Sequence, residues 1–144
     1  VTRAEMAVFV ERALHGGSYQ PPVVPLTFND INGHWAQYWI ERSNAEGITT
    51  GCGGGKYCPD QNVTRAEMSV FILRALHGGS YQPPVVGLTF NDTTEHWAQY
   101  WIEQFKTEGI TTGCGGGKYC PDQNVTRAEM AVFIVRAFGY PVLP

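Results

Sequence analysis

The sequence predicts an all-α fold of tandem helical repeats, joined by long extended linkers and by glycine-rich loops. The hexapeptide Val-Thr-Arg-Ala-Glu-Met begins at residues 1, 63 and 125, which gives a period of 62 residues. Residues 1–62 and 63–124 are identical at 51 of 62 positions. In each copy, two segments carry apolar residues at the i, i+3, i+4 spacing of an amphipathic helix. A fixed period is typical of repeat proteins, in which each unit buries its apolar face against a neighbour.

The hexapeptide itself predicts a helix start. Thr64 is a good N-cap whose hydroxyl can accept a hydrogen bond from the N–H of Glu67, and the Glu67 carboxylate can accept from Thr64 in return. Val63 before the cap and Met68 in the first turns are placed to form a hydrophobic staple. Arg65 has no part in this cap, so it needs another explanation.

The first helix is expected to run from Thr2 to about His15, where two glycines stop it. Its apolar stripe recurs in the later copies, which predicts the same helix three times. The stripes contain Met6, Phe9, Val10, Ala13 and Leu14, then Met68, Phe71, Ile72, Ala75 and Leu76, then Met130, Phe133, Ile134, Ala137 and Phe138.

Extended linkers are expected at 17–27 and 79–89. Pro21 and Pro22 fix an extended path and exclude a helix there. We expect the first linker to cross the surface of the bundle, with Tyr19, Val23 and Val24 packed against it.

The second helix of each copy is expected to start near Asn32 or Thr94, because both are good N-caps. It should end before a glycine followed by isoleucine, as at Gly47, which is a common helix terminus. One apolar face is expected to hold Trp35, Ala36, Trp39 and Ile40, and in the second copy Trp97, Ala98, Trp101, Ile102 and Phe105.

The four cysteines lie in two identical loops, each of the form Cys-Gly-Gly-Gly-Lys-Tyr-Cys. Two cysteines that flank three glycines can meet without strain, so we expect disulfides between Cys52 and Cys58 and between Cys114 and Cys120. The alternative is a metal site, but the spacing is wider than in zinc sites and no histidine lies nearby in sequence. No metal site is therefore expected. Disulfides indicate an oxidising compartment outside the cytosol.

Composition narrows the function classes. The chain is 43% hydrophobic and 16% charged, with a formal charge of −3, as in a globular protein of few charges. It is not basic, so it lacks the electrostatic signature of nucleic-acid binding. No run of 18 apolar residues is present, so no membrane span is expected. No catalytic triad order, carboxylate pair or phosphate loop stands out, so we expect neither an enzyme nor a cofactor. The sequence begins inside a helix start, which suggests a processed chain or part of a longer protein.

Five spaced motifs resemble the S-layer homology family. They are Phe28-x-Asp30, His34-Trp35-Ala36, Gly47-Ile48-x-x-Gly51, Tyr57-Cys58-Pro59 and the hexapeptide at 63–68, and all recur in the second copy. The resemblance implies helical units grouped as a pseudo-trimer, whose grooves hold a cell-wall polysaccharide that often bears acidic groups. It implies binding roles for Arg3, Arg65 and Arg127, for Asp30 and Asp92, and for Trp35 and Trp97.

Each of these roles has a structural alternative. Arginine presents a planar fork suited to a carboxylate, and a tryptophan face can pack on a sugar. The two tryptophans could equally be core residues, and the aspartates could hold a turn. We expect the arginines at 65 and 127 to lie in grooves between units and to be at least partly accessible to solvent.

The chain departs from the family pattern in two ways. Cysteines replace an aromatic and a polar residue in the loop, which puts ligand contacts from that loop in doubt. Counted from Trp helix to Arg helix, the chain holds repeats at 28–78 and 90–138 and a leading half-repeat at 1–16. We expect the leading helix to lack a partner helix within the chain.

Positions that differ between the copies suggest different surroundings. Glu11 is replaced by Leu73 and Val135, and Ser43 is replaced by Phe105. We infer that Leu73, Phe105 and Val135 line an apolar contact between successive repeats. Around Glu11 and Ser43 this contact is expected to be absent or hydrated. The alternative is neutral drift at exposed positions. The repeats would then form a directional array, in which the leading helix has different surroundings from the later helices.

Weaker signals remain. Asn62, Asn91 and Asn124 match the glycosylation sequon, although capping chemistry and chance explain them as well. The four histidines fall at expected helix ends and lack a catalytic spacing. The sequence favours a non-catalytic module on the bacterial cell surface, outside the cell, which attaches a protein to the wall by binding polysaccharide. The second hypothesis is a subunit that assembles head-to-tail with copies of itself into a filament, sheath or layer.

Overall fold

The computed structural model describes residues 1–141. Within that range the chain forms five helices and no extended strand, only isolated β-bridges, which confirms the predicted all-α class. The helices are α1 (Arg3–His15), α2 (Gln37–Ala45), α3 (Arg65–His77), α4 (Gln99–Thr107) and α5 (Arg127–Phe138). In this described part, no helix combines the length and hydropathy needed to cross a bilayer.

The predicted start of the Arg helices is confirmed. The Thr2 hydroxyl accepts from the N–H of Glu5, and the Glu5 carboxylate accepts from the N–H of Thr2, so the capping box is complete. The same box caps α3 and α5. Gly16 ends α1 with φ of 99°, a backbone conformation that residues with a Cβ rarely adopt.

The predicted start of the Trp helices is wrong. α2 begins at Gln37, five residues after Asn32, and its N-cap Ala36 has no side-chain cap. Local side chains hold the preceding segment in turns: Nδ1 of His34 accepts from the N–H of Ala36, and Oε1 of Gln37 accepts from Gly33. These bonds engage the N–H groups of Gly33 and Ala36, and they hold the segment before Gln37 in turns where a helix was expected.

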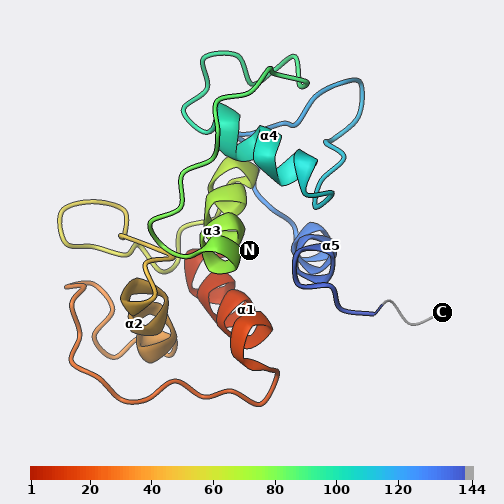
Figure 1. Cartoon of the computed structure of the whole chain (residues 1–144). Helices are drawn as coiled ribbons and strands as arrows, with labels where there is room; N and C mark the ends of the chain where they lie inside the picture. The colour runs from red at the N-terminus through yellow and green to blue at the C-terminus, as the bar shows by residue number, and fades with distance from the viewer. Residues whose placement is uncertain (142–144) are drawn as a thin grey trace.

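Three Arg helices surround a common axis (Figure 1). α1, α3 and α5 each contact the other two, and the N-terminus lies between them. Backbone hydrogen bonds close a ring at this end of the helices. Val63 N donates to Val1 O, Val125 N donates to Val63 O, and Val1 N donates to Val125 O, each at 2.9 Å. This ring gives the fold the expected pseudo-trimeric arrangement.

Each Trp helix packs on the outside of the Arg helix that precedes it. α2 contacts α1 and α4 contacts α3 (Figure 1). The expectation that the leading helix lacks a partner is therefore wrong, because α1 packs against α2 across buried alanines, Ala4 and Ala7. The helix without an outer neighbour in the described part is α5, where the equivalent Ala128 and Ala131 are exposed.

The linkers cross the surface without regular structure, but they pack less than expected. Tyr19 lies edge-on against Trp39, with ring centroids 5.9 Å apart. Val23, by contrast, is 77% exposed, and Val24 is also exposed, so the expected packing of these two valines is wrong. Tyr19 and Leu26 are the residues of the first linker that pack against the core.

Candidate functional site

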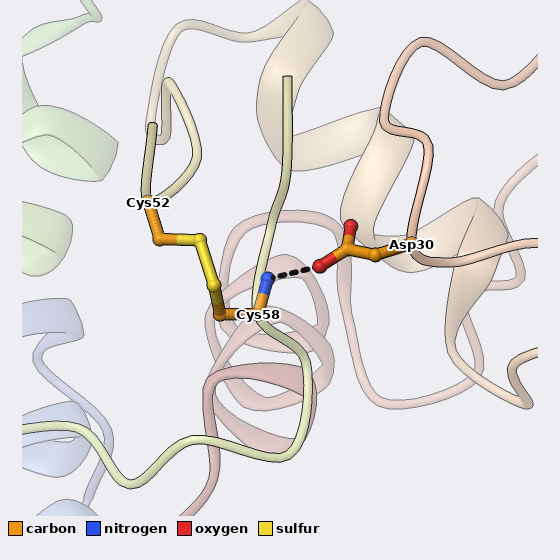
Figure 2. Close-up of side chains that lie close together, drawn as sticks. All are labelled: Asp30, Cys52 and Cys58. Carbon is orange, nitrogen blue, oxygen red and sulfur yellow. Dashed lines mark hydrogen bonds between the residues drawn. A yellow bond between two sulfur atoms is a disulfide. The ribbon is translucent and has the colours of Figure 1, made fainter. Parts of the chain in front are cut away.

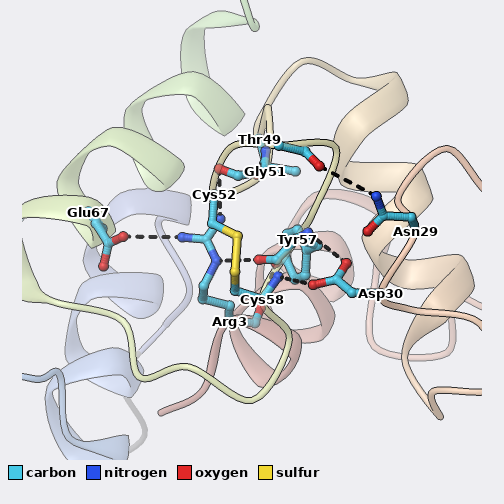
Figure 3. The surroundings of a disulfide bond; sticks show 10 residues. Arg3, Asn29, Asp30, Thr49, Gly51, Cys52, Tyr57, Cys58 and Glu67 are labelled. Carbon is cyan, nitrogen blue, oxygen red and sulfur yellow. Dashed lines mark hydrogen bonds and ion pairs between the residues drawn. A yellow bond between two sulfur atoms is a disulfide. The ribbon is translucent and has the colours of Figure 1, made fainter.

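Arg3 lies buried between the cysteine loop and α3 (Figure 3). Its Nε donates to Tyr57 O at 2.8 Å and its Nη2 donates to Gly51 O at 3.2 Å. Its Nη1 forms an ion pair with Glu67 of α3 at 3.2 Å. The guanidinium also lies over the Tyr57 ring, 4.9 Å from its centroid. Arg3 thus joins its own loop to the next Arg helix.

Arg65 repeats most of this arrangement one unit later, although its Nη2 is buried without a hydrogen-bond partner in the described residues. Its Nε donates to Tyr119 O at 2.8 Å, and its Nη1 pairs with Glu129 of α5. Only 2% of Arg65 is exposed, so the expectation that it is accessible to solvent is wrong. The second cysteine loop, which contains Tyr119 at 54 positions after Arg65, covers this arginine. Arg127 pairs with Glu5 of α1 and is 67% exposed, as expected.

The disulfides Cys52–Cys58 and Cys114–Cys120 are both present, and no cysteine is free. Asp30 positions the first loop by accepting from the N–H groups of Tyr57 and Cys58, both at 2.8 Å (Figure 2 shows the second bond). Partial burial acts to raise the pKa of Asp30, but these backbone donors outweigh it and hold the pKa below its usual range. Asp92 does the same in the second loop.

Gly51 explains how the loop brings a carbonyl to Arg3. Its φ is 86°, and a Cβ at this position would lie 2.3 Å from Lys56 O and 2.7 Å from the Phe28 ring. Only glycine fits both constraints. Residues Thr49, Thr50 and Gly51, which we call the Thr-Thr-Gly turn, therefore have a fixed shape. They form one wall of the groove described next.

Two equivalent grooves lie between successive Arg helices in the described part of the chain. The first, which we call the Arg3 groove, encloses about 220 Å³ and the second, the Arg65 groove, about 270 Å³. Both are smaller than the roughly 300–1,000 Å³ of sites that enclose drug-sized ligands, so each suits a small group. The Arg3 groove is lined by Arg3, Thr49, Thr50, Gly51, Glu67, Val70, Phe71, Arg74 and Trp97, and the Arg65 groove by Arg65, Thr111, Thr112, Gly113, Ala128, Glu129, Val132, Phe133 and Arg136.

Arg74 and Arg136 supply the groove charge that the sequence reasoning missed. Arg3 and Arg65 are each neutralised by a glutamate, whereas neither Arg74 nor Arg136 forms an ion pair within the described residues. Arg74 is half-buried over the Trp101 ring, 5.5 Å from its centroid. Both arginines follow the motif arginine of their own helix by nine residues, two and a half turns that place them on its opposite face, so the motif gave no signal of their place in a groove.

The tryptophans of the His-Trp-Ala motif are not core residues. Trp35 is 64% exposed and Trp97 is 63% exposed, so their expected place on the apolar helix face is wrong. The late helix start is the reason, because both residues precede the first turn of their helix. Trp97 lines the Arg3 groove, while Trp35 lines neither groove.

The polar pair of the first copy is buried. Glu11 and Ser43 are fully inaccessible, and the Ser43 hydroxyl donates to Oε1 of Glu11 at 2.7 Å. Burial raises the pKa of Glu11 to about 7, and the Ser43 hydrogen bond partly opposes this rise. The expectation of wet surroundings here is therefore wrong.

Leu73 and Phe105 take the same places in the second copy and are equally buried. Phe105 packs edge-on against Phe133 of α5 with centroids 5.1 Å apart, whereas Val135 is only half-buried. Glu11 and Ser43 are as inaccessible to solvent as Leu73 and Phe105. The difference between the copies therefore does not reflect a difference in burial, and it gives no support to a directional array of repeats.

Comparison with known sequences decides the family. The model of the S-layer homology domain matches residues 27–69 and 89–131. The chain belongs to the S-layer homology family. Each matched segment of this S-layer homology chain holds the Phe-x-Asp start, a Trp helix, a disulfide-closed loop and the first turn of the next Arg helix.

Relatives of this S-layer homology chain are much longer proteins. Cell surface glycoprotein 1 of Acetivibrio thermocellus is 30% identical over 95% of the chain, and amylopullulanase of Thermoanaerobacterium thermosulfurigenes is 32% identical over 88% of it. S-layer protein EA1 of Bacillus anthracis is 28% identical over 75%. The chain spans only 6%, 7% and 12% of these relatives.

Proposed function

We propose that this chain is a non-catalytic module that attaches a protein to the outside of the bacterial cell wall by binding an anionic wall polysaccharide. The observation that carries the proposal is the recurrence of one groove with the same lining. In each groove a Thr-Thr-Gly turn faces an Arg helix, and one arginine remains without an ion pair among the described residues. The family and the printed names of the relatives support attachment at the cell surface.

The charges in the groove favour an acidic saccharide. The buried Arg3–Glu67 pair has no net charge, so Arg74 gives the Arg3 groove a positive potential. A guanidinium can hold a carboxylate through two parallel hydrogen bonds. Trp97 adds an exposed aromatic face at the same groove, suited to the apolar face of a sugar ring. Arg3, Arg65, Asp30 and Asp92 then act mainly by shaping the groove.

Co-sedimentation with purified cell wall tests this function. The double variant Arg74→Ala/Arg136→Ala should lose most of its binding, because it removes the unpaired cation from both grooves. Arg12→Ala is the matched control. Arg12 occupies the equivalent position on α1 and lies over Trp39 as Arg74 lies over Trp101, but it lines neither groove.

The outcomes separate the groove from general charge effects. Wall from which the anionic polysaccharide has been extracted should bind neither the native protein nor the control variant. If the double variant stays folded and still sediments with wall like Arg12→Ala, the grooves do not bind the polysaccharide. Equal loss in the double variant and in Arg12→Ala would indicate nonspecific electrostatic attraction.

Self-assembly is a second candidate function, and the outer face of α5 is the observation that favours it. On α1 the equivalent face is buried under α2, whereas on α5 Val132 is 43% exposed beside exposed Ala128 and Ala131. A Trp helix from a neighbouring chain could cover this face. Protein that pellets alone, without cell wall, would support assembly; protein that remains monomeric at high concentration would exclude it.

A further inference from the structure

A histidine and two glutamates meet where the C-terminal end of α1 faces the end of α2. Glu11 and His15 are one turn apart on α1, with Glu11 Oε2 3.5 Å from His15 Nε2. Glu46 caps α2, and its Oε1 lies 2.7 Å from the same nitrogen. One oxygen or nitrogen from each residue lies within 4.8 Å of the others. Three ligand atoms therefore converge on one small volume.

Glu11 Oε2 is the atom that local interactions leave unexplained. The Glu11 side chain is fully buried, and its other oxygen accepts from Ser43. Oε2 is inaccessible to solvent and has no hydrogen-bond partner within the described residues; its polar neighbour His15 Nε2, at 3.5 Å, pairs with it only when the imidazole is protonated. It points toward the imidazole of His15. A buried carboxylate oxygen without a partner is costly, which suggests that a further group satisfies it.

The second repeat keeps two of the three ligands and loses the buried one. His77 and Glu108 occupy the places of His15 and Glu46, with His77 Nε2 2.8 Å from Glu108 Oε1. Leu73 replaces Glu11, and Phe105 replaces the serine that bonds to it. The second repeat therefore keeps the His–Glu pair but lacks the buried carboxylate, and it serves as a comparison within the same chain.

We propose that Glu11, His15 and Glu46 bind a divalent transition-metal ion such as Zn²⁺. One imidazole nitrogen and two carboxylate oxygens, with an open fourth position, form a common zinc ligand set. In a tetrahedral site the ligand atoms lie about 3.3 Å apart, which is close to the separation of Glu11 Oε2 and His15 Nε2.

Two features decide how the ion reaches this site and how tightly it binds. The side chains of His15 and Glu46 are 30% and 20% exposed, so the ion can enter from solvent on their side. Arg42 competes for the ion's place, because its Nη2 pairs with Glu46 Oε1 at 2.5 Å. In the second repeat this residue is Gln104, which also donates to the equivalent oxygen, Glu108 Oε1, at 2.6 Å. Arg42→Ala, which removes the competing donor altogether, should therefore strengthen metal binding.

Calorimetric titration of the oxidised, metal-free protein with ZnCl₂ tests the site. The native chain should bind one Zn²⁺ that Glu11→Gln and His15→Asn each weaken at least tenfold, an effect on the scale known for altered metal sites. Glu11→Gln keeps an acceptor for Ser43, so the helix pair is preserved. His77→Asn, the matched control, should leave Zn²⁺ binding unchanged. Mg²⁺ and Ca²⁺ should not bind here, because both prefer oxygen ligands alone.

A gain of binding gives an independent test. Leu73→Glu/Phe105→Ser installs the missing ligand and its hydroxyl partner in the second repeat, where no arginine competes, and should raise the stoichiometry from one Zn²⁺ to two. Circular dichroism first establishes that the variant is folded. A folded variant without a second site overturns the assignment, as does undiminished Zn²⁺ affinity in Glu11→Gln and His15→Asn. Loss of the site in His77→Asn would also overturn it.

Discussion

Arg127 Nη1 lies 2.8 Å from Glu5 Oε1, although 122 positions separate the two residues. This ion pair closes a cycle in which each Arg helix binds the glutamate of the next, through Arg3–Glu67 and Arg65–Glu129. The three pairs have the same chemistry but different exposure. Arg3 and Arg65 are covered by cysteine loops, whereas no loop in the described part covers Arg127.

Removing a covered arginine should therefore cost far more stability than removing the exposed one. We expect Arg65→Ala to lower the free energy of unfolding by about 2–4 kcal/mol, because Tyr119 O loses its donor and a cavity remains. Arg127→Ala should cost less than about 1 kcal/mol. Urea unfolding measures both. Equal losses would mean that the loop does not set the strength of these pairs.

Each disulfide should stabilise the fold to a similar degree. Replacing Cys52 and Cys58 by alanine should cost roughly 2 kcal/mol, the chain-entropy value for so short a loop. The matched change at Cys114 and Cys120 should cost about the same, because both disulfides join cysteines six positions apart and Asp30 and Asp92 hold the two loops through equivalent hydrogen bonds. Thermal unfolding of the two double variants tests this. A large difference between them would show that the loops do not contribute equally.

Low pH should lower the free energy of unfolding because Asp30 and Asp92 become protonated. Backbone hydrogen bonds hold the pKa of each carboxyl below 3.8 in the folded chain. The folded state therefore binds fewer protons than the unfolded state in this range. The stabilisation is fully present above the unfolded pKa of 3.8 and is lost as pH falls below it. Asp30→Asn/Asp92→Asn should flatten the decline of unfolding free energy with acid; an unchanged slope would contradict the assignment.

Glu11 and Ser43 should behave as a coupled pair. Glu11→Leu leaves a buried hydroxyl without its acceptor, and Ser43→Phe crowds the carboxylate, so each single change should destabilise the fold. The double change copies the second repeat and should recover part of the loss. A double-mutant cycle in chelator should give a coupling of about 0.5–3 kcal/mol. Simple additivity would show that the two sites are independent.

Trp97 should matter for wall binding more than Trp35. Both indoles are about equally exposed, but only Trp97 lines a groove that also holds Arg74. Trp97→Ala should reduce co-sedimentation with cell wall several-fold, and Trp35→Ala should reduce it less. Neither change should affect stability much, because neither ring is buried. If Trp35→Ala has the larger effect, the Arg3 groove is not the main site.

Local signals predicted the fold well, and long-range contacts explain the errors. The capping boxes and disulfides involve residues at most six positions apart, so spacing alone indicates them. The burial of Arg65 depends on Tyr119, 54 positions away, and periodicity carries no information about that contact. The predicted start of the Trp helix was wrong because the side chains of His34 and Gln37 bond to the backbone of Ala36 and Gly33 and hold this segment in turns.

Long-range contacts also explain why the sequence did not predict the groove. Arg74, Trp97 and the Thr-Thr-Gly turn come from different elements that meet only when the Arg helices surround their axis. Family resemblance drew attention to the motif arginine, which the structure places beneath the groove. The accessible cation of the Arg3 groove, Arg74, comes from α3 and not from the helix that carries Arg3, and it had no role in the motif.

Near-identity between copies creates a risk of mispairing during folding. α1 could dock on α4, and α3 on α2, because most residues of the partners are the same. Such a swap would bury Glu11 against Phe105 and leave Ser43 facing Leu73, so a carboxylate would lose its only hydroxyl donor. An unsatisfied buried group of this kind costs about 1–3 kcal/mol or more. The hydrogen bond between Glu11 and Ser43 thus favours the native pairing, α1 with α2 and α3 with α4, over the exchanged pairing.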